Sequence, residues 1–290
     1  MAGKREIDAV SGTETTGHEW DGIRELNTPL PRWWLWTFYA TIVWAVGYMV
    51  LMPAVPLIDS HTEGLLGYSS RAVVAERLAE AAAEQQVYLD RIGQSDLGGI
   101  VQDPELFAFA QAGGRSAFLV NCAQCHGQGA AGSVGFPNLN DDDWLWGGTL
   151  QEIDHTLHVG IRSDHPETRQ NVMAAYLRDG LLTRQEVGAV AEYVLSLSGR
   201  ATDEAAAAAG AGIFAEQCVA CHQEGGVGSQ ELGAPNLTDS VWLYGGDRQS
   251  IVETVSNGRS GVMPAWGERL SEETIKMLAV YVHQLGGGEQ

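Results

Sequence analysis

All four cysteines of this chain belong to two copies of one pattern, Cys-x-x-Cys-His, which comprise Cys122, Cys125 and His126 and then Cys218, Cys221 and His222. Two thiols one helical turn apart can bond covalently to both vinyl groups on one porphyrin edge, and the adjacent histidine then lies beneath the iron. A redox-active cysteine pair would need a βαβ context, which this sequence lacks, and a zinc site would have to join two distant pairs. The pattern therefore predicts two covalently bound c-type haems, with His126 and His222 as proximal iron ligands.

A methionine stands in a loop-like context after each motif. Met263 lies in "GVMPAW", and Met173, the only methionine near the first motif, lies in "NVMAAY". Thioether ligation is typical of cytochrome iron and raises its potential, so we predict both methionines as sixth ligands. Met277 is the rival in the second copy, but its amphipathic helical context favours core packing. Because Ala174 replaces Pro264 after the methionine, we expect the two loops to be held differently.

Two histidines offer an alternative to Met173. His155 and His158 lie one helical turn apart in "EIDHTLHVGIR" and could form a bis-histidine site in its place. The aligned segment of the second copy, "SIVETVSNGR", has no counterpart of either histidine. Surface or propionate-side roles are therefore favoured for both.

Several residues near the motifs recur in both copies and suit the edge of a haem. Arg162 and Arg259 correspond in the alignment, and each could pair with a buried propionate. Trp144 and Trp242 carry N–H groups on aromatic walls, as haem edges require, although packing in the domain core explains them equally well. Two Pro-Asn pairs are expected to shape the loop on the methionine side, Pro137–Asn138 and Pro235–Asn236.

The segments around these residues repeat in a common order. "FLVNCAQCHGQG" matches "FAEQCVACHQEG", and "PNLNDDDWLWGG" matches "PNLTDSVWLYGG". The repeat predicts two copies of one all-α domain, residues 104–199 and 200–290, each with a first helix, the motif, a long loop, a short helix, the methionine loop and a terminal helix. An alanine-rich linker, 199–210, is expected to open the first helix of the second copy.

An apolar run precedes the domains. No acidic or basic residue occurs from Trp33 to Ile58, and Trp33 to Met52 as a helix would span roughly one bilayer core. Since a largely polar segment of 32 residues precedes the run, we predict an uncleaved transmembrane anchor at 33–58 rather than a signal peptide. More basic residues precede the run than follow it closely, which places the N-terminal segment, 1–32, in the cytoplasm and the rest in a periplasm.

Residues 59–103 form a predicted helical linker between anchor and domains. Residues 70–93 are rich in alanine and glutamate, which indicates a helix that is either a solvated spacer or a strut against a partner. "SDLGGIVQDP" then breaks the pattern and indicates a domain boundary. The chain carries 37 acidic and 17 basic residues, spread evenly, so it repels nucleic acid and favours basic partners.

With the anchor segment "TPLPRWWLWTFYATIVW", the tandem domains resemble the dihaem subunit (subunit III) of cbb3-type cytochrome c oxidases, over nearly the whole chain. The resemblance implies a non-catalytic, single-pass inner-membrane subunit of a proton-translocating oxidase. It would receive electrons from a cytochrome c donor or the bc1 complex. It would pass them to a monohaem cytochrome c subunit and then to the haem–copper catalytic subunit that reduces oxygen. By position, the axial pairs would be His126 with Met173 and His222 with Met263.

Three questions stay open in the sequence. The methionines could serve their own domains or be exchanged between them. A free-standing anchored dihaem shuttle would carry the same motifs, and only copurification with an oxidase would distinguish it. A dihaem peroxidase would need one open or histidine-ligated iron, and a methionine in both copies argues against it.

Overall fold

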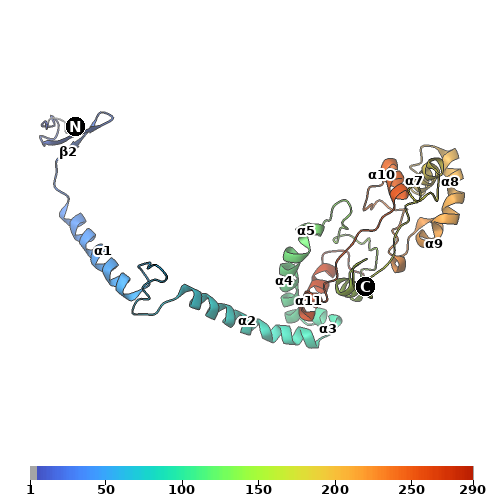
Figure 1. The fold of residues 1–290 in the computed structure, drawn as a ribbon, viewed down its shortest axis with the longest axis horizontal. Coiled ribbons are helices and arrows are strands. Elements are labelled where there is room, and N and C mark those ends of the chain that lie inside the picture. Colours follow the sequence, from blue (N-terminus) through green and yellow to red (C-terminus); the bar gives the residue numbers. More distant parts are fainter. Residues whose placement is uncertain (1–4, 290) are drawn as a thin grey trace. The chain divides into compact units, whose positions relative to one another are not determined.

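The computed structural model describes residues 5–289 and divides the chain into two compact units, with the boundary between Ala82 and Ala83. In the first unit, β1 (Thr15–Trp20) and β2 (Ile23–Leu26) form an antiparallel hairpin (Figure 1). Its two-residue loop, Asp21–Gly22, has positive φ at both positions, as the tightest hairpin turn requires. This hairpin is an addition to the all-α architecture that the sequence predicts.

The helix α1 (Arg32–Leu51) confirms the predicted apolar helix. It has 20 residues, enough to cross a membrane, and none of its side chains is buried. The predicted anchor extends to residue 58, but the helix ends earlier because Met52 is extended and Pro53 follows it. Proline disfavours the helical conformation of the residue before it and removes a backbone donor.

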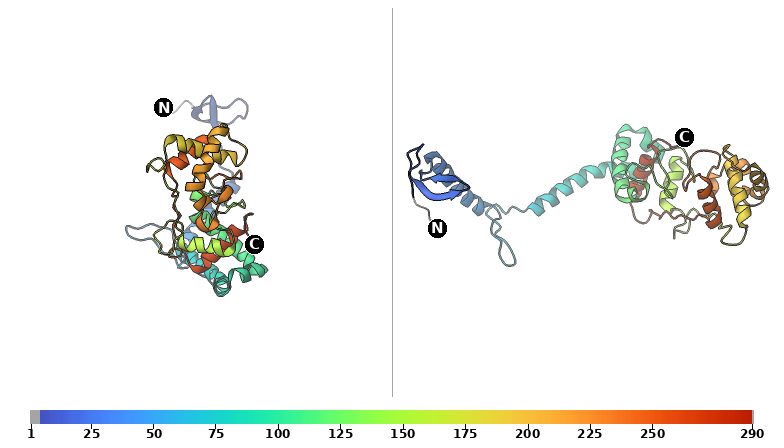
Figure 2. Two further views of the ribbon diagram at one scale, coloured as in Figure 1. Left: turned by 90° about the vertical axis from the view of Figure 1, so that its right-hand side faces the viewer. Right: turned by 90° about the horizontal axis from the view of Figure 1, so that it is seen from above.

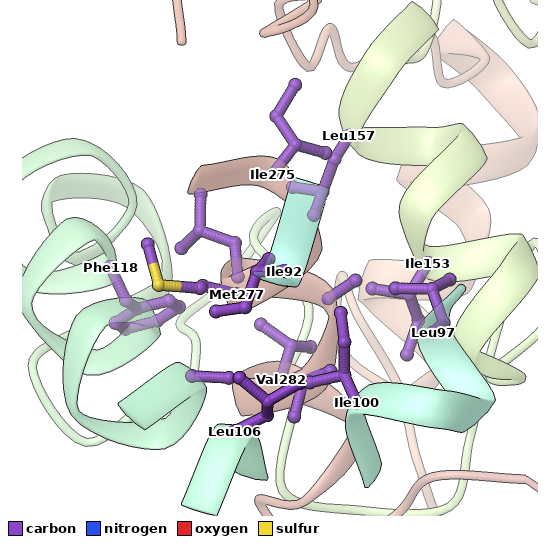
Figure 3. Close-up of a cluster of buried hydrophobic side chains, with 14 of the residues drawn as sticks. Ile92, Leu97, Ile100, Leu106, Phe118, Ile153, Leu157, Ile275, Met277 and Val282 are labelled. Atoms are coloured by element: carbon purple, nitrogen blue, oxygen red, sulfur yellow. The ribbon is translucent and has the colours of Figure 1, made fainter. Parts of the chain in front are cut away.

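The helix α2 (Ser70–Gln94) confirms the predicted helix at 70–93, but the domain boundary after it is wrong. Ile92 near its end is fully buried, and Leu97 and Ile100 of α3 (Leu97–Gln102) are buried with it. All three belong to one apolar cluster with Phe118 and Met277 (Figure 3). The segment "SDLGGIVQDP" is therefore part of a packed core, and Met277 is a core residue, as predicted.

The predicted order of helices occurs twice in the second unit. The first copy contributes α4 (Pro104–Asn121), α5 (Ala123–His126), α6 (Leu150–Val159) and α7 (Arg184–Ser196). The second contributes α8 (Glu204–Gln217), α9 (Val219–His222), η1 (Glu224–Gly226), η2 (Gln230–Leu232), α10 (Arg248–Asn257) and α11 (Glu272–His283). The alanine run indeed opens α8. Side chains of Ser, Thr or Asp cap the N-termini of α4, α6, α7, α8, α10 and α11.

The terminal helices are exchanged between the copies. The first helix of the first copy, α4, packs on α11, whereas α8 packs on α7. Figures 1 and 2 show the dark red α11 beside the green α4, and α10 beside α7 and α8. Glycine allows each close crossing: a Cβ on Gly114 would lie 2.2 Å from the carbonyl oxygen of Met277, and one on Gly210 would lie 2.1 Å from that of Ala189.

Each packed module therefore combines both copies. The Cys122 module consists of α3 to α6 with α11, and the Cys218 module consists of α7 to α10. The two predicted copies, 104–199 and 200–290, are therefore not packed separately, because the terminal helix of each packs on the first helix of the other. Both terminal helices carry a tyrosine, Tyr193 or Tyr281, against a phenylalanine of the first helix. Because both copies carry this tyrosine and this phenylalanine, the sequence predicts that a terminal helix packs on each first helix. It does not predict which copy supplies that terminal helix.

Candidate functional site: two Cys-x-x-Cys-His pockets

Each motif forms a single helical turn. In α5 the N–H groups of Cys125 and His126 both donate to the carbonyl oxygen of Cys122, at 3.1 and 2.9 Å. The equivalent bonds of α9, from Cys221 and His222 to Cys218, have the same lengths. The turn places both sulfurs of a motif one helical turn apart, as attachment to one porphyrin edge requires.

Both motif histidines are oriented by a proline carbonyl. His126 Nδ1 lies 3.0 Å from the oxygen of Pro137, and His222 Nδ1 lies 3.1 Å from that of Pro235. Since a carbonyl can only accept, Nδ1 carries the proton and the Nε2 lone pair is free for a metal. Burial lowers the pKa of both histidines, which favours the neutral form that binds iron. The two prolines therefore act on the histidine side, not on the methionine side as the sequence analysis predicts.

A cavity of about 440 Å³ lies beside the Cys218 motif, and first-copy residues between Ala131 and Leu145 also line it. Its walls include Cys218, Cys221 and His222 from the second copy and Met173 from the first. Met173 also packs against the apolar cluster of this module, with Cys218 and Trp242. The first copy's methionine therefore lies with the second copy's motif.

The Cys122 module shows the reverse arrangement. Met263 packs against the cluster that contains Phe118, and so do Cys122 and Ala123 of the first motif. Pairing by position, His126 with Met173 and His222 with Met263, therefore differs from the structure. Each methionine instead lies with the motif of the other copy, because the chain crosses between modules before each methionine.

The backbone of each methionine is held in the same way. Met263 and Ile161 exchange two hydrogen bonds of 2.9 Å, and Met173 and Arg259 exchange bonds of 3.0 and 3.2 Å. A glycine with positive φ precedes each partner, and a Cβ there would lie within 2.5 Å of the methionine carbonyl oxygen, at Gly160 for Met263 and at Gly258 for Met173. Only glycine combines this φ with this close approach.

Arg169, which the sequence analysis missed, corresponds structurally to Arg259. The Arg259 guanidinium lies 4.1 Å from the ring centre of Tyr244, and that of Arg169 lies 5.5 Å from the ring centre of Trp146. Each guanidinium also donates to a threonine of the preceding helix, Thr254 for Arg259 and Thr156 for Arg169. The signal is a shared Arg-x-x-Val-Met in "RQNVM" and "RSGVM", which an insertion after Ile161 displaces.

Arg162 has a different position from the one predicted. It lines the cavity of the Cys218 module together with Arg259, so the structure does not place one of these arginines at each motif. Its Nε and Nη1 donate to the carbonyl oxygens of Gly261 and Asn171, at 2.5 and 2.6 Å. Burial lowers its pKa.

The two equivalent tryptophans differ in their partners. Trp242 Nε1 is buried beside the Cys218 cavity and has no hydrogen-bond acceptor among the described residues. Trp144 Nε1 donates to the carbonyl oxygen of Gly287 at 2.6 Å. An unused buried donor in a cavity lined by arginines fits a ligand with carboxylates, and haem propionates meet that need.

His155 and His158 lie outside the cavity that contains Met173 and His222. They line a surface hollow instead, where His158 Nε2 is 2.9 Å from a carboxylate oxygen of Glu272. Neither competes with Met173 in this arrangement, in agreement with the surface role favoured from the sequence.

Together, the two modules and the apolar helix α1 define a tandem c-type cytochrome with a membrane anchor. Three family models match successive parts of the chain: the N-terminal domain of cytochrome oxidase-cbb3, FixP, at residues 12–59; cytochrome c at 111–198; and cbb3-type cytochrome c oxidase subunit III at 205–282. Cytochrome c domains imply covalently bound haem c, and the residues described above fit it.

Curated relatives match over nearly their whole length. The chain is 57% identical to the cbb3-type cytochrome c oxidase subunit FixP of Bradyrhizobium sp. (strain ORS 278), over 100% of both chains. It is 54% identical to subunit CcoP of Cereibacter sphaeroides, over 95% of each chain, and 50% identical to FixP of Rhizobium meliloti, over 100% of both. The chain belongs to this family, the membrane-bound FixP/CcoP cytochrome c subunits of cbb3-type oxidases.

Proposed function

We propose that this subunit carries electrons through two haems, from a cytochrome c donor or the bc1 complex toward the monohaem and haem–copper subunits. The observation that supports this most directly is that each Cys-x-x-Cys-His turn shares its module with a loop methionine. The lipid bilayer is the partner of α1. Basic residues before α1 favour a cytoplasmic N-terminus and periplasmic modules.

Each module supplies a complete set of iron ligands. In the Cys122 module, His126 Nε2 and the Met263 sulfur would hold the haem iron; in the Cys218 module, His222 Nε2 and the Met173 sulfur would. When bound, haem c supplies an iron that takes up and releases one electron. The thioether favours the reduced iron and therefore a high potential. Because the chain offers a histidine and a methionine for each iron, a dihaem peroxidase is disfavoured.

The surroundings of the cavity hold the charged edge of the cofactor. Arg259 and Arg162 form no ion pair with any described carboxylate, and Trp242 retains a free N–H group. These three donors are suited to the propionates in the Cys218 module. Trp144 and Arg169 are the structural equivalents in the Cys122 module, where they already donate to Gly287 and Glu152.

Copurification and haem quantification test this function. The tagged chain, solubilised from membranes, should carry two covalent haems and bring down the haem–copper and monohaem subunits. Reduced donor cytochrome c should then transfer electrons to the chain before oxygen is consumed. A dihaem chain that purifies without an oxidase would instead indicate a free-standing shuttle.

A further inference from the structure

Two short segments carry the chain between the modules. Residues 170–172 connect Arg169 to Met173, and residues 260–262 connect Arg259 to Met263. We call them the crossing segments. Each begins next to one module's helix and ends at the methionine of the other module. The bridges at Met173 and Met263 fix their ends. Whatever fixes the middle of these segments therefore influences both methionine positions.

One side chain contacts the middle residue of both crossing segments. Arg162 donates through Nε to the carbonyl oxygen of Gly261 and through Nη1 to that of Asn171. A guanidinium presents these donors in a fixed planar fork, which a lysine cannot reproduce. The side chain of Asn171 continues the contact into the Cys218 module, where it donates to the carbonyl oxygen of Leu232 at 2.6 Å.

The backbone conformation of Arg162 indicates that the surrounding structure holds this residue in place. Its φ of 49° lies in the left-handed region, which costs a residue with a Cβ free energy and persists only where the surroundings require it. Its N–H donates to the carbonyl oxygen of Arg169 at 2.9 Å, at the start of one crossing segment. No carboxylate among the described residues forms an ion pair with it. Its charge therefore acts on the two carbonyl groups.

We propose that Arg162 is a positioning residue for both haem sites: by joining the crossing segments, it holds Met173 and Met263 at their irons together. The proposal rests on the proposed function, in which both methionines are iron ligands. One side chain thus supports both methionine positions, although the two motifs belong to different modules. A hydrogen bond to a charged group contributes enough free energy to change an equilibrium constant about tenfold.

The test is Arg162→Gln in the full-length, membrane-extracted protein. Covalent haem content should stay at two, because the cysteines retain both groups. The near-infrared thioether–iron band of the ferric protein should lose more than half of its intensity, because both methionines lose their support. Added imidazole should bind about tenfold more tightly at both irons.

Two variants serve as controls. Arg178→Gln removes the same charge from the exposed end of the Met173 loop, where the Arg178 side chain hydrogen-bonds only to Asp179 among the described residues, and should leave the band unchanged. Arg259→Gln removes an arginine that serves the Cys218 module alone, so the band should fall by at most half.

The outcomes separate the proposals. A band that is unchanged in Arg162→Gln, or that loses no more than half, overturns the shared role of Arg162. If Arg162→Gln accumulates poorly, Arg162→Lys replaces it, since lysine keeps the charge but lacks the planar guanidinium. The band should again lose more than half of its intensity. A parent protein with two haems and no thioether band would instead refute methionine ligation itself, and with it the proposal.

Discussion

The Cys122 and Cys218 modules share one backbone plan but hold their terminal helices by different means. In the Cys218 module, Glu192 of α7 is 2% exposed and accepts hydrogen bonds from Arg248 Nε at 2.6 Å and from the N–H of Thr202 at 2.8 Å. The equivalent positions in the Cys122 module are Val280 of α11 and Leu150 of α6, and both belong to its apolar cluster. One module uses a buried carboxylate paired with a half-exposed arginine where the other uses apolar contacts.

This difference gives the exchange of helices a physical reason. If α7 packed within its own copy, Glu192 would meet Leu150 and lose its cationic partner. Arg248 would then meet Val280 of α11. A buried charge without a partner is strongly destabilising, so polar and apolar positions sort the helices into the exchanged arrangement.

Lys276 makes a second contact that favours the exchanged arrangement of the terminal helices. Its ammonium group on α11 donates to the carbonyl oxygens of Gly93 and Ser95, each at 3.0 Å, at the end of α2. A cation there satisfies carbonyl groups that a helix end leaves free. Gly188 occupies the equivalent position of α7 and has no side chain to do this. The carbonyl groups at the end of α2 therefore favour packing of α11, rather than α7, at this position.

The largest effect on stability is expected for Glu192→Val, which removes the polar side of this comparison. It should lower the free energy of unfolding by roughly 3 kcal/mol, because the hydrogen bonds that the charged carboxylate accepts from Thr202, Asp203 and Arg248 are lost. Denaturant titration followed by circular dichroism measures this. The double variant Glu192→Val/Arg248→Leu copies the Cys122 module and should recover most of the loss. A single variant as stable as the parent would contradict the sorting role.

Acid should weaken the Cys218 module through the same carboxylate. Hydrogen bonds from the Thr202 N–H and from Arg248 lower the pKa of Glu192 from 4.5 to about 2. A lowered pKa stabilises the fold fully above the unfolded value and loses that contribution as pH falls toward 2. The free energy of unfolding should therefore fall more steeply from pH 5 to 2.5 in the parent than in Glu192→Gln. Parallel curves would show that Glu192 contributes nothing in this range.

A smaller effect is expected for Lys276→Met, which removes the cap of α2 from the Cys122 module but keeps an apolar stem. The loss should be roughly 2 kcal/mol, since the hydrogen bonds of a charged donor are removed. Amide exchange should increase at the end of α2 and in α3. Arg184→Met, at an exposed position at the start of α7, is the matched control and should change neither quantity. Increased exchange in α7 instead would indicate that Lys276 stabilises the other module.

Sequence reasoning succeeded where a local pattern has one physical solution. The Cys-x-x-Cys-His turns, the apolar anchor helix and the helix order follow from spacing and periodicity. The core role of Met277 follows in the same way. The Asp21–Gly22 hairpin was equally local and was missed, although an Asp-Gly turn is a strong hairpin signal.

A comparison of the two copies could not predict that their terminal helices are exchanged. Gly114 and Gly210, like Tyr281 and Tyr193, make the same helix contact in either pairing, so similarity between copies carries no information about the choice. Single differences decide it, above all Glu192 against Val280. Arg169 was missed for a related reason. The alignment matched Arg162 to Arg259, because both come shortly after the glycine that ends the preceding helix.

The smallest expected effect on stability belongs to Met173→Leu, and it distinguishes the two pairings of ligands most sharply. Leucine nearly matches methionine in volume, so the fold should lose less than about 1.5 kcal/mol. The near-infrared thioether–iron band should fall by about half, and the potential of one haem should drop, because a soft ligand of the reduced iron is lost. Repeating the change in a Cys218→Ala/Cys221→Ala background, where only the Cys122 module retains haem, tests the exchange. There Met173→Leu should leave the remaining band intact, while Met263→Leu should abolish it. The opposite result would restore pairing within each copy.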